Sequence, residues 1–255
     1  MYRIYFFVLL VVFGFVVACA PQKEVSVVES MNVTENYSYR LQIAISYVVS
    51  GYYQRAISEF EDLKKIKETP ELYNYLGLAY MGVGDFDRAV EAYKKAIGLK
   101  SGYPEAYSNL SACYVAMGNF DAAIEAASKA LEDKSYPKPE IPLTNMAQAY
   151  FGKGEIDLAI DTLNKALMLN PFYPVPYEIL IRYYLEAGDY QSAKRYLNDA
   201  DALEINSAGL SFYRALFKLR DGERDEAKKL FNEIVRTYPG TIWANQAKVY
   251  LEVVE

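Results

Sequence analysis

The chain has 255 residues, with 27 basic and 33 acidic side chains, a formal net charge of −6 and no histidine. This mildly acidic balance, without a basic tract, argues against a nucleic-acid partner. Without histidine the chain can form neither a Ser-His-Asp or Cys-His catalytic arrangement nor a zinc site with histidine ligands. Its carboxylates fall mostly on the expected solvent faces of helices, and no phosphate-loop motif occurs. We therefore expect no enzyme, no cofactor, no metal and no small-molecule substrate.

Residues 1–18 are predicted to be a signal peptide that is removed. Residues 4–18 form an apolar run of fifteen residues, which is shorter than the roughly 20 that a membrane-spanning helix needs. Arg3 before the run and small residues at its end are typical of a secretory signal. The mature chain is therefore expected to be exported and to begin at residue 19.

Cys19 stands at the end of this signal, and three interpretations compete: the end of a membrane span, a disulfide with Cys113, or a lipid-attachment site. The short apolar run disfavours the span, and the repeat register described below places Cys113 inside a helix. Residues 16–19, Val-Val-Ala-Cys, resemble the bacterial lipobox, which implies cleavage before Cys19 and lipid modification of its side chain. Alanine rather than aspartate at position 20 implies sorting to the outer membrane, facing the periplasm. Several acyl chains on one cysteine would hold the protein at the membrane stably.

Residues 19–36 show no periodicity and are predicted to be a flexible linker, and an internal repeat follows them. Six glycines recur at spacings of 33, 34, 36, 34 and 34 residues. An alanine stands five residues after each glycine, and a tyrosine stands four residues before five of the six. The three columns are Gly51, Gly84, Gly118, Gly154, Gly188 and Gly222; Ala56, Ala89, Ala123, Ala159, Ala193 and Ala227; and Tyr47, Tyr80, Tyr114, Tyr150 and Tyr184.

Each column has a mechanical reason in a pair of packed helices. Glycine ends the first helix at low conformational cost, alanine lets the second helix approach closely, and the aromatic residues fill the space between helices. The pattern resembles the tetratricopeptide repeat, which implies an all-α, right-handed α-solenoid. Within 37–240, the predicted units are 37–69, 70–103, 104–139, 140–173, 174–207 and 208–240, and residues 241–255 are predicted to cap the stack with one helix. The repeat register places Cys113 in the first helix of the third unit. We expect it to be a packing residue and not a reactive thiol, because no basic side chain flanks it in the sequence.

Such a solenoid usually binds other molecules through its concave face, which the first helix of each unit lines. In the first three units the inner positions are mostly apolar, and we expect a groove that accepts an amphipathic helix of a protein partner. The alternative is that the linker or neighbouring helices cover some of these residues. The predicted groove residues are Leu41, Ile45, Val48, Asn74, Leu78, Met81, Asn109, Ala112 and Val115. The inner positions of the later units are Thr144, Gln148, Phe151, Glu178, Arg182, Leu185, Phe212, Leu216 and Leu219.

Two stretches resemble a narrower group. SYPKPEIPLTNMAQAYFGKGEIDLAIDTLNKALMLNP at 135–171 and RTYPGTIWANQAK at 236–248 are similar to segments of the type IV pilus pilotin family (PilF, PilW and Tgl). This resemblance implies a non-enzymatic outer-membrane lipoprotein that binds secretin subunits and promotes their localisation and assembly into multimers. The alternative is a periplasmic adaptor that scaffolds peptidoglycan enzymes on the same repeats.

Overall fold

The computed structural model describes residues 27–254, with side chains from Asn36 to Glu252, and this range forms thirteen α-helices and no strand. The helices are α1 (Val27–Val49), α2 (Tyr53–Lys64), α3 (Pro70–Gly82), α4 (Phe86–Leu99), α5 (Pro104–Ala116), α6 (Phe120–Glu132), α7 (Glu140–Lys153), α8 (Ile156–Leu169), α9 (Pro174–Glu186), α10 (Tyr190–Ala202), α11 (Ala208–Arg220), α12 (Arg224–Thr237) and α13 (Ile242–Val254). The predicted all-α repeat architecture is confirmed.

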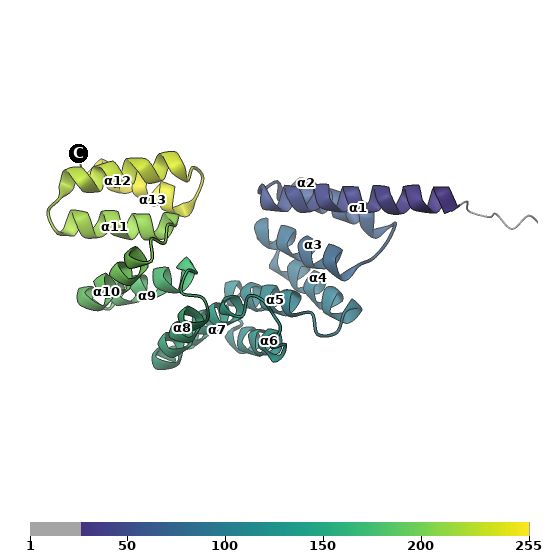
Figure 1. Ribbon diagram of the computed structural model, residues 1–255, viewed down its shortest axis with the longest axis horizontal. Helices are drawn as coiled ribbons and strands as arrows, with labels where there is room; N and C mark the ends of the chain where they lie inside the picture. The colour runs from purple at the N-terminus through teal and green to yellow at the C-terminus, as the bar shows by residue number, and fades with distance from the viewer. Residues whose placement is uncertain (1–26, 255) are drawn as a thin grey trace, which may run out of the picture.

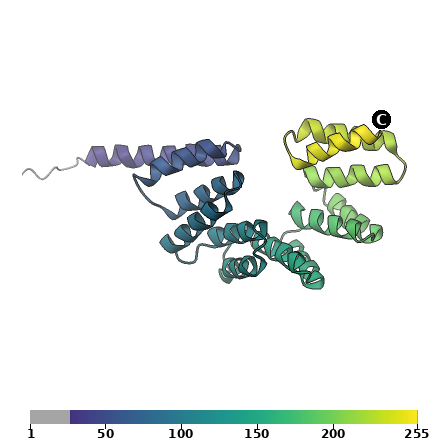
Figure 2. The ribbon, with the colours of Figure 1, turned by 180° about the vertical axis from the view of Figure 1, so that it is seen from behind.

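Consecutive helices pack as hairpin pairs, from α1 with α2 to α11 with α12, and α13 packs against α12. The pairs stack into an open arc, with α1 and α2 at one end and α11, α12 and α13 at the other (Figure 1). Helices α5, α7 and α9 lie toward the inside of the arc, and their partners α6, α8 and α10 lie toward the outside, as the view from behind also shows (Figure 2). The concave face in the middle of the arc is therefore built by the first helix of each pair.

Five helices begin at the first residue of a predicted unit, namely at Pro70, Pro104, Glu140, Pro174 and Ala208. Three of these residues are prolines, which suit the first position of a helix because the N–H that they lack has no partner there in any case. The junctions between units are thus set by local sequence.

The first helix corrects the prediction of a linker. Helix α1 begins at Val27, so residues 27–36 are helical where a flexible segment was expected. No glycine or proline stands between Gln22 and Ser50, so no helix-breaking residue precedes the turn at Gly51. Cys19 and the predicted signal peptide lie outside the described residues. None of the described helices combines the length and the apolar character needed to cross a bilayer.

The hairpins turn at the column glycines. Gly84 has a φ of +79°, and the N–H of Asp85 donates to the carbonyl of Tyr80 at 2.9 Å, which closes the Schellman turn at the end of α3. The other five column glycines have φ values between +74° and +85°. A side chain at such a position would cost about 1–2 kcal/mol, which explains why glycine recurs there.

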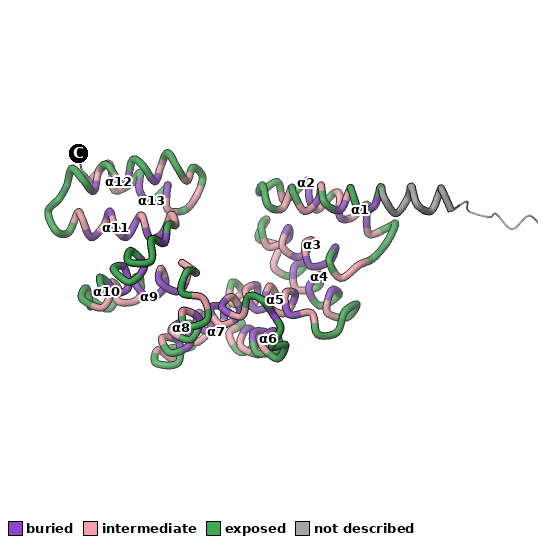
Figure 3. The backbone as a smooth tube through the Cα atoms, in the orientation of Figure 1, coloured by how far each residue is buried: buried purple, intermediate pink, exposed green. Residues whose placement is uncertain are grey.

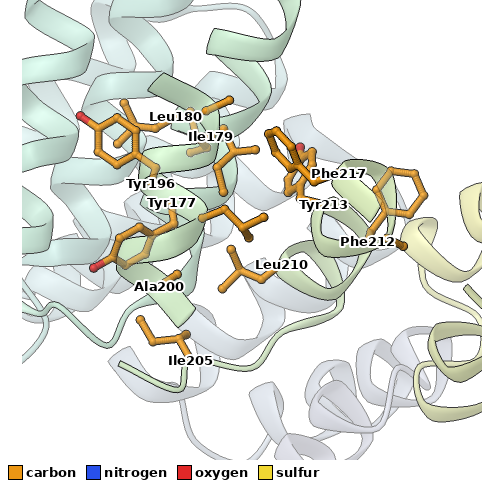
Figure 4. Close-up of a cluster of buried hydrophobic side chains, with 14 of the residues drawn as sticks. Tyr177, Ile179, Leu180, Tyr196, Ala200, Ile205, Leu210, Phe212, Tyr213 and Phe217 are labelled. Carbon is orange, nitrogen blue, oxygen red and sulfur yellow. The ribbon is translucent and has the colours of Figure 1, made fainter. Parts of the chain in front are cut away.

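Each column alanine is the fourth residue of the second helix of its pair, and all six have no exposed surface. Larger side chains nine residues after the glycine, such as Phe60, Tyr93 and Phe231, are equally buried. Figure 3 shows the buried positions along the facing sides of the helices. Most of the buried hydrophobic side chains form two clusters, one within α1–α6 and one within α7–α13. Figure 4 shows part of the second cluster, in which side chains of α9, α10 and α11 meet.

Two helical glycines give a matched test of this packing. A Cβ on Gly77 would lie 2.5 Å from Cε1 of the fully buried Tyr93, whereas a Cβ on Gly98 would meet nothing within 4 Å. We expect Gly77→Ala to lower the free energy of unfolding by about 1–3 kcal/mol through overpacking. Gly98→Ala should raise it by about 0.5–1 kcal/mol, because alanine is the better helix former. Urea denaturation measures both, and equal stability of the two variants would contradict this account.

Candidate functional site

The concave side of the C-terminal half holds a hollow of about 640 Å³ between α9, α11 and α13. Most of its lining is apolar or aromatic, and a few polar groups converge on it. The lining residues are Gln148 of α7; Val175, Glu178, Ile179, Arg182, Leu185 and Glu186 of α9; Phe212, Tyr213 and Leu216 of α11; and Ile242, Trp243, Gln246, Val249 and Tyr250 of α13. A concave, mainly apolar surface with few polar groups is the usual form of a binding site.

Aromatic rings form one side of the hollow. The ring of Phe212 lies 5.4 Å from that of Trp243 and 5.5 Å from that of Tyr250, measured between centroids. Tyr250 in turn stacks on Phe231 of α12 at 5.3 Å. Because Phe212 and Phe231 are buried, these contacts hold α13 against α11 and α12.

The rim on α13 is apolar and open to solvent. Ile242 and Val249 are 67% and 60% exposed, and they stand seven residues apart on the same face of the helix. Exposed aliphatic side chains beside a concave apolar surface indicate a surface that another molecule covers.

Glu178 is the polar group held most firmly in the hollow. Its Oε1 accepts a hydrogen bond of 2.6 Å from the hydroxyl of Ser207, which caps α11 by accepting from the N–H of Leu210 at 3.1 Å. A Cβ on Gly209 would collide with the Glu178 carboxyl group, so glycine provides the space for it. Burial raises the pKa of Glu178, and the Ser207 hydrogen bond opposes part of that shift.

Three charges follow each other along the lining of α9. Glu178, Arg182 and Glu186 are spaced by four residues, so that they share one helix face. None of them forms an ion pair with another described residue. Burial raises the pKa of the neighbouring Tyr213, Arg182 opposes this, and Glu178 and Glu186 add to it. The hollow therefore presents a row of negative, positive and negative side chains.

The predicted groove in the first three units is more closed than expected. Leu41 and Asn74 are each only 5% exposed, so neither side chain offers a surface to a partner. The other predicted groove residues, Ile45, Val48, Leu78, Met81, Asn109, Ala112 and Val115, are half-buried. Helix α1 packs against α3, and this contact brings Leu41 into the core cluster of α1–α6.

Amide side chains link the first helices of neighbouring units. Nδ2 of Asn109 donates to Oδ1 of Asn74 at 2.9 Å, which joins α5 to α3. Nδ2 of Asn145 donates to the carbonyl of Ser108 at 3.0 Å and to the Ser111 hydroxyl at 2.8 Å, which joins α7 to α5. The amides of Asn74, Asn109 and Asn145 thus stabilise the stack of units.

In the later units, six of the nine residues that the repeat register assigned to the inner face line the hollow: Gln148, Glu178, Arg182, Leu185, Phe212 and Leu216. Thr144, Phe151 and Leu219 are not part of its lining. The contribution of α13 was not expected, because residues 241–255 were predicted only to cap the stack. The spacing of Ile242, Gln246 and Val249 was the available signal, since residues four and seven apart share a helix face.

No group of three or more side chains in the described part of the chain is arranged to hold a metal ion. The thiol of Cys113 is fully buried and donates to the carbonyl of Phe86 at 3.5 Å. Burial raises its pKa to about 11, and the charge of Asp87 adds to the shift. This thiol is therefore a packing group, as the repeat register predicted, and not a nucleophile.

Comparison with known families agrees with this architecture. Models described as tetratricopeptide repeat match residues 41–104, 80–141, 142–173 and 208–241. The chain therefore belongs to the tetratricopeptide repeat family, whose members typically bind other proteins. Among curated proteins, none matches the chain.

Several solved structures share the fold. PilF of Pseudomonas aeruginosa is 17% identical, with a TM-score of 0.63, and the match covers 86% of this chain and 99% of PilF. PilW, described as a widely conserved type IV pilus biogenesis factor, is 20% identical with a TM-score of 0.64, over 82% of this chain and 97% of PilW. A tetratricopeptide repeat protein from Parabacteroides merdae is 17% identical with a TM-score of 0.70, over 86% of this chain and 84% of its own. At such identities the likeness concerns the fold.

The buried thiol yields a test. In a leaderless protein with Cys19→Ser, Cys113 is the single cysteine, and we expect no reaction with a maleimide near neutral pH while the fold is intact. Unfolding in urea should expose it to rapid labelling. Because the folded-state pKa is about 11 and the ordinary value is 9.0, this group contributes stability below pH 9.0, and the contribution is lost as the pH rises through 11. Rapid labelling of the native protein near neutral pH would contradict this placement.

Proposed function

We propose that the protein is a non-enzymatic outer-membrane lipoprotein that captures secretin subunits of the type IV pilus and promotes their assembly into multimers. The observation that carries this proposal is the open apolar hollow on a repeat arc whose fold PilF and PilW share over 86% and 82% of this chain. PilW is described as a pilus biogenesis factor, and the proposal transfers that role to this chain. The lipobox resemblance at Cys19 supports the location.

Lipid and solenoid would act together in this function. The acyl chains on Cys19 would fix the protein at the inner leaflet of the outer membrane. The concave face would bind a secretin subunit and hold it there. Subunits confined at one surface meet at a higher effective concentration than free ones, which favours assembly without any catalytic group.

A genetic experiment tests this function. In a strain that lacks the protein, we expect heat-resistant secretin multimers to disappear from the outer membrane and monomers to remain. The wild-type gene should restore the multimers, and Cys19→Ala should not, because the unlipidated protein cannot hold subunits at the membrane.

Cys113→Ala is the matched control, since it removes the other cysteine and leaves the lipid site intact. It should restore the multimers like the wild type. Multimers that persist in the deletion strain would refute the proposed function.

A further inference from the structure

We propose that the hollow between α9, α11 and α13 binds an amphipathic helix of a protein partner, which inserts an apolar face against α13 and places lysine or arginine beside Glu178 and Glu186. This inference rests on the proposed function in one respect, that the concave face captures a protein. It adds the place of binding and the chemistry of the bound segment.

The walls of the hollow are long enough for a helix. On α9 the lining runs from Val175 to Glu186, which is about 16 Å at ~1.5 Å per residue. On α13 it runs from Ile242 to Tyr250, or about 12 Å. About three turns of a partner helix match these lengths, and two apolar stripes that flank a groove are the usual seat of an amphipathic helix.

The apolar lining has a free edge that such a helix would cover. Ile242 and Val249 are more than half exposed, whereas Phe212 and Tyr213 behind them are each 4% exposed. The hollow therefore has buried aromatic side chains at its base and exposed aliphatic side chains at its rim. A central apolar contact with a more open rim is the arrangement of protein-binding surfaces.

Charge decides which helix fits. The lining holds two carboxylates and one guanidinium, with no ion pair to satisfy them among the described residues. Ser207 and the space at Gly209 hold Glu178 in the wall, so its charge stays at the hollow. A partner helix with one acidic residue, and one basic residue four positions to either side of it, would oppose Arg182 with the acidic residue and Glu178 and Glu186 with the basic ones. An acidic helix would be repelled.

The test uses two synthetic helical peptides with the same stripe of leucine residues and no tryptophan. One peptide carries lysine and the other carries glutamate at the positions that flank the leucine stripe. Trp243 is the single tryptophan of the chain and lies in the hollow, so its fluorescence reports occupancy directly. We expect the lysine peptide to bind at least about tenfold more tightly than the glutamate peptide, since close charge pairs commonly contribute this much.

Substitutions at exposed residues distinguish binding in the hollow from binding to other exposed apolar side chains. Ile242→Ser with Val249→Ser should weaken the lysine peptide about tenfold or more, because two buried aliphatic contacts are lost. Met168→Ser with Phe172→Ser is the matched control: these residues are 83% and 64% exposed, lie outside the hollow, and should leave the affinity unchanged. Glu178→Gln with Glu186→Gln should remove the preference for lysine, while glutamine at 178 can still accept from Ser207.

The inference is overturned if neither peptide binds, if the two bind equally, or if the Ile242 and Val249 substitutions have no effect. Such a result would leave the secretin experiment untouched, because loss of multimers in the deletion strain does not depend on the place of binding. Conversely, unchanged multimers together with selective peptide binding would refute the secretin role and keep the site.

Discussion

The close packing of two helices around a buried alanine is the contact on which the rest of this structure depends. Because Ala123 and its five equivalents have no exposed surface, any larger side chain there would push a pair apart. A pair of helices of 12 to 14 residues cannot cover its own apolar faces, so each unit relies on the next. The pair α11 and α12 is covered by α13. Ile242 and Val249 of α13 stay exposed and form the rim of the hollow.

Several boundaries between repeat units could be predicted from the sequence to the exact residue, because glycine and proline mark them locally. Gly84 needs a positive φ that other residues resist, and Pro104 fits the first turn of a helix, so both mark boundaries without knowledge of the neighbours. The start of α1 at Val27 could not be predicted in this way. Residues 27–36 carry no repeat column, and only the absence of glycine and proline favours helix there.

The inner-facing positions could be predicted too, but not which of them stay open. The repeat register assigns both Asn74 and Glu178 to the concave side, yet Asn74 accepts a hydrogen bond from the next unit and is buried, whereas Glu178 lines a hollow. Whether an inner-facing side chain is buried or exposed depends on the distance between neighbouring units. The repeat register does not give that distance. The position of Trp243 in the lining of the hollow was missed for another reason. The repeat pattern ends at residue 240, so the last helix has no repeat positions from which its inner face could be assigned.

The most direct test of the central claim, that the concave hollow captures secretin subunits at the outer membrane, is photo-crosslinking in cells. A photo-crosslinking amino acid would replace Val249 in the protein expressed with residues 1–19 unchanged, and Met168 in a parallel variant. Both side chains are exposed, but only Val249 lines the hollow. The account predicts a crosslink to the secretin subunit from position 249 and none from position 168. A crosslink from position 168 alone, or from neither position, would contradict it.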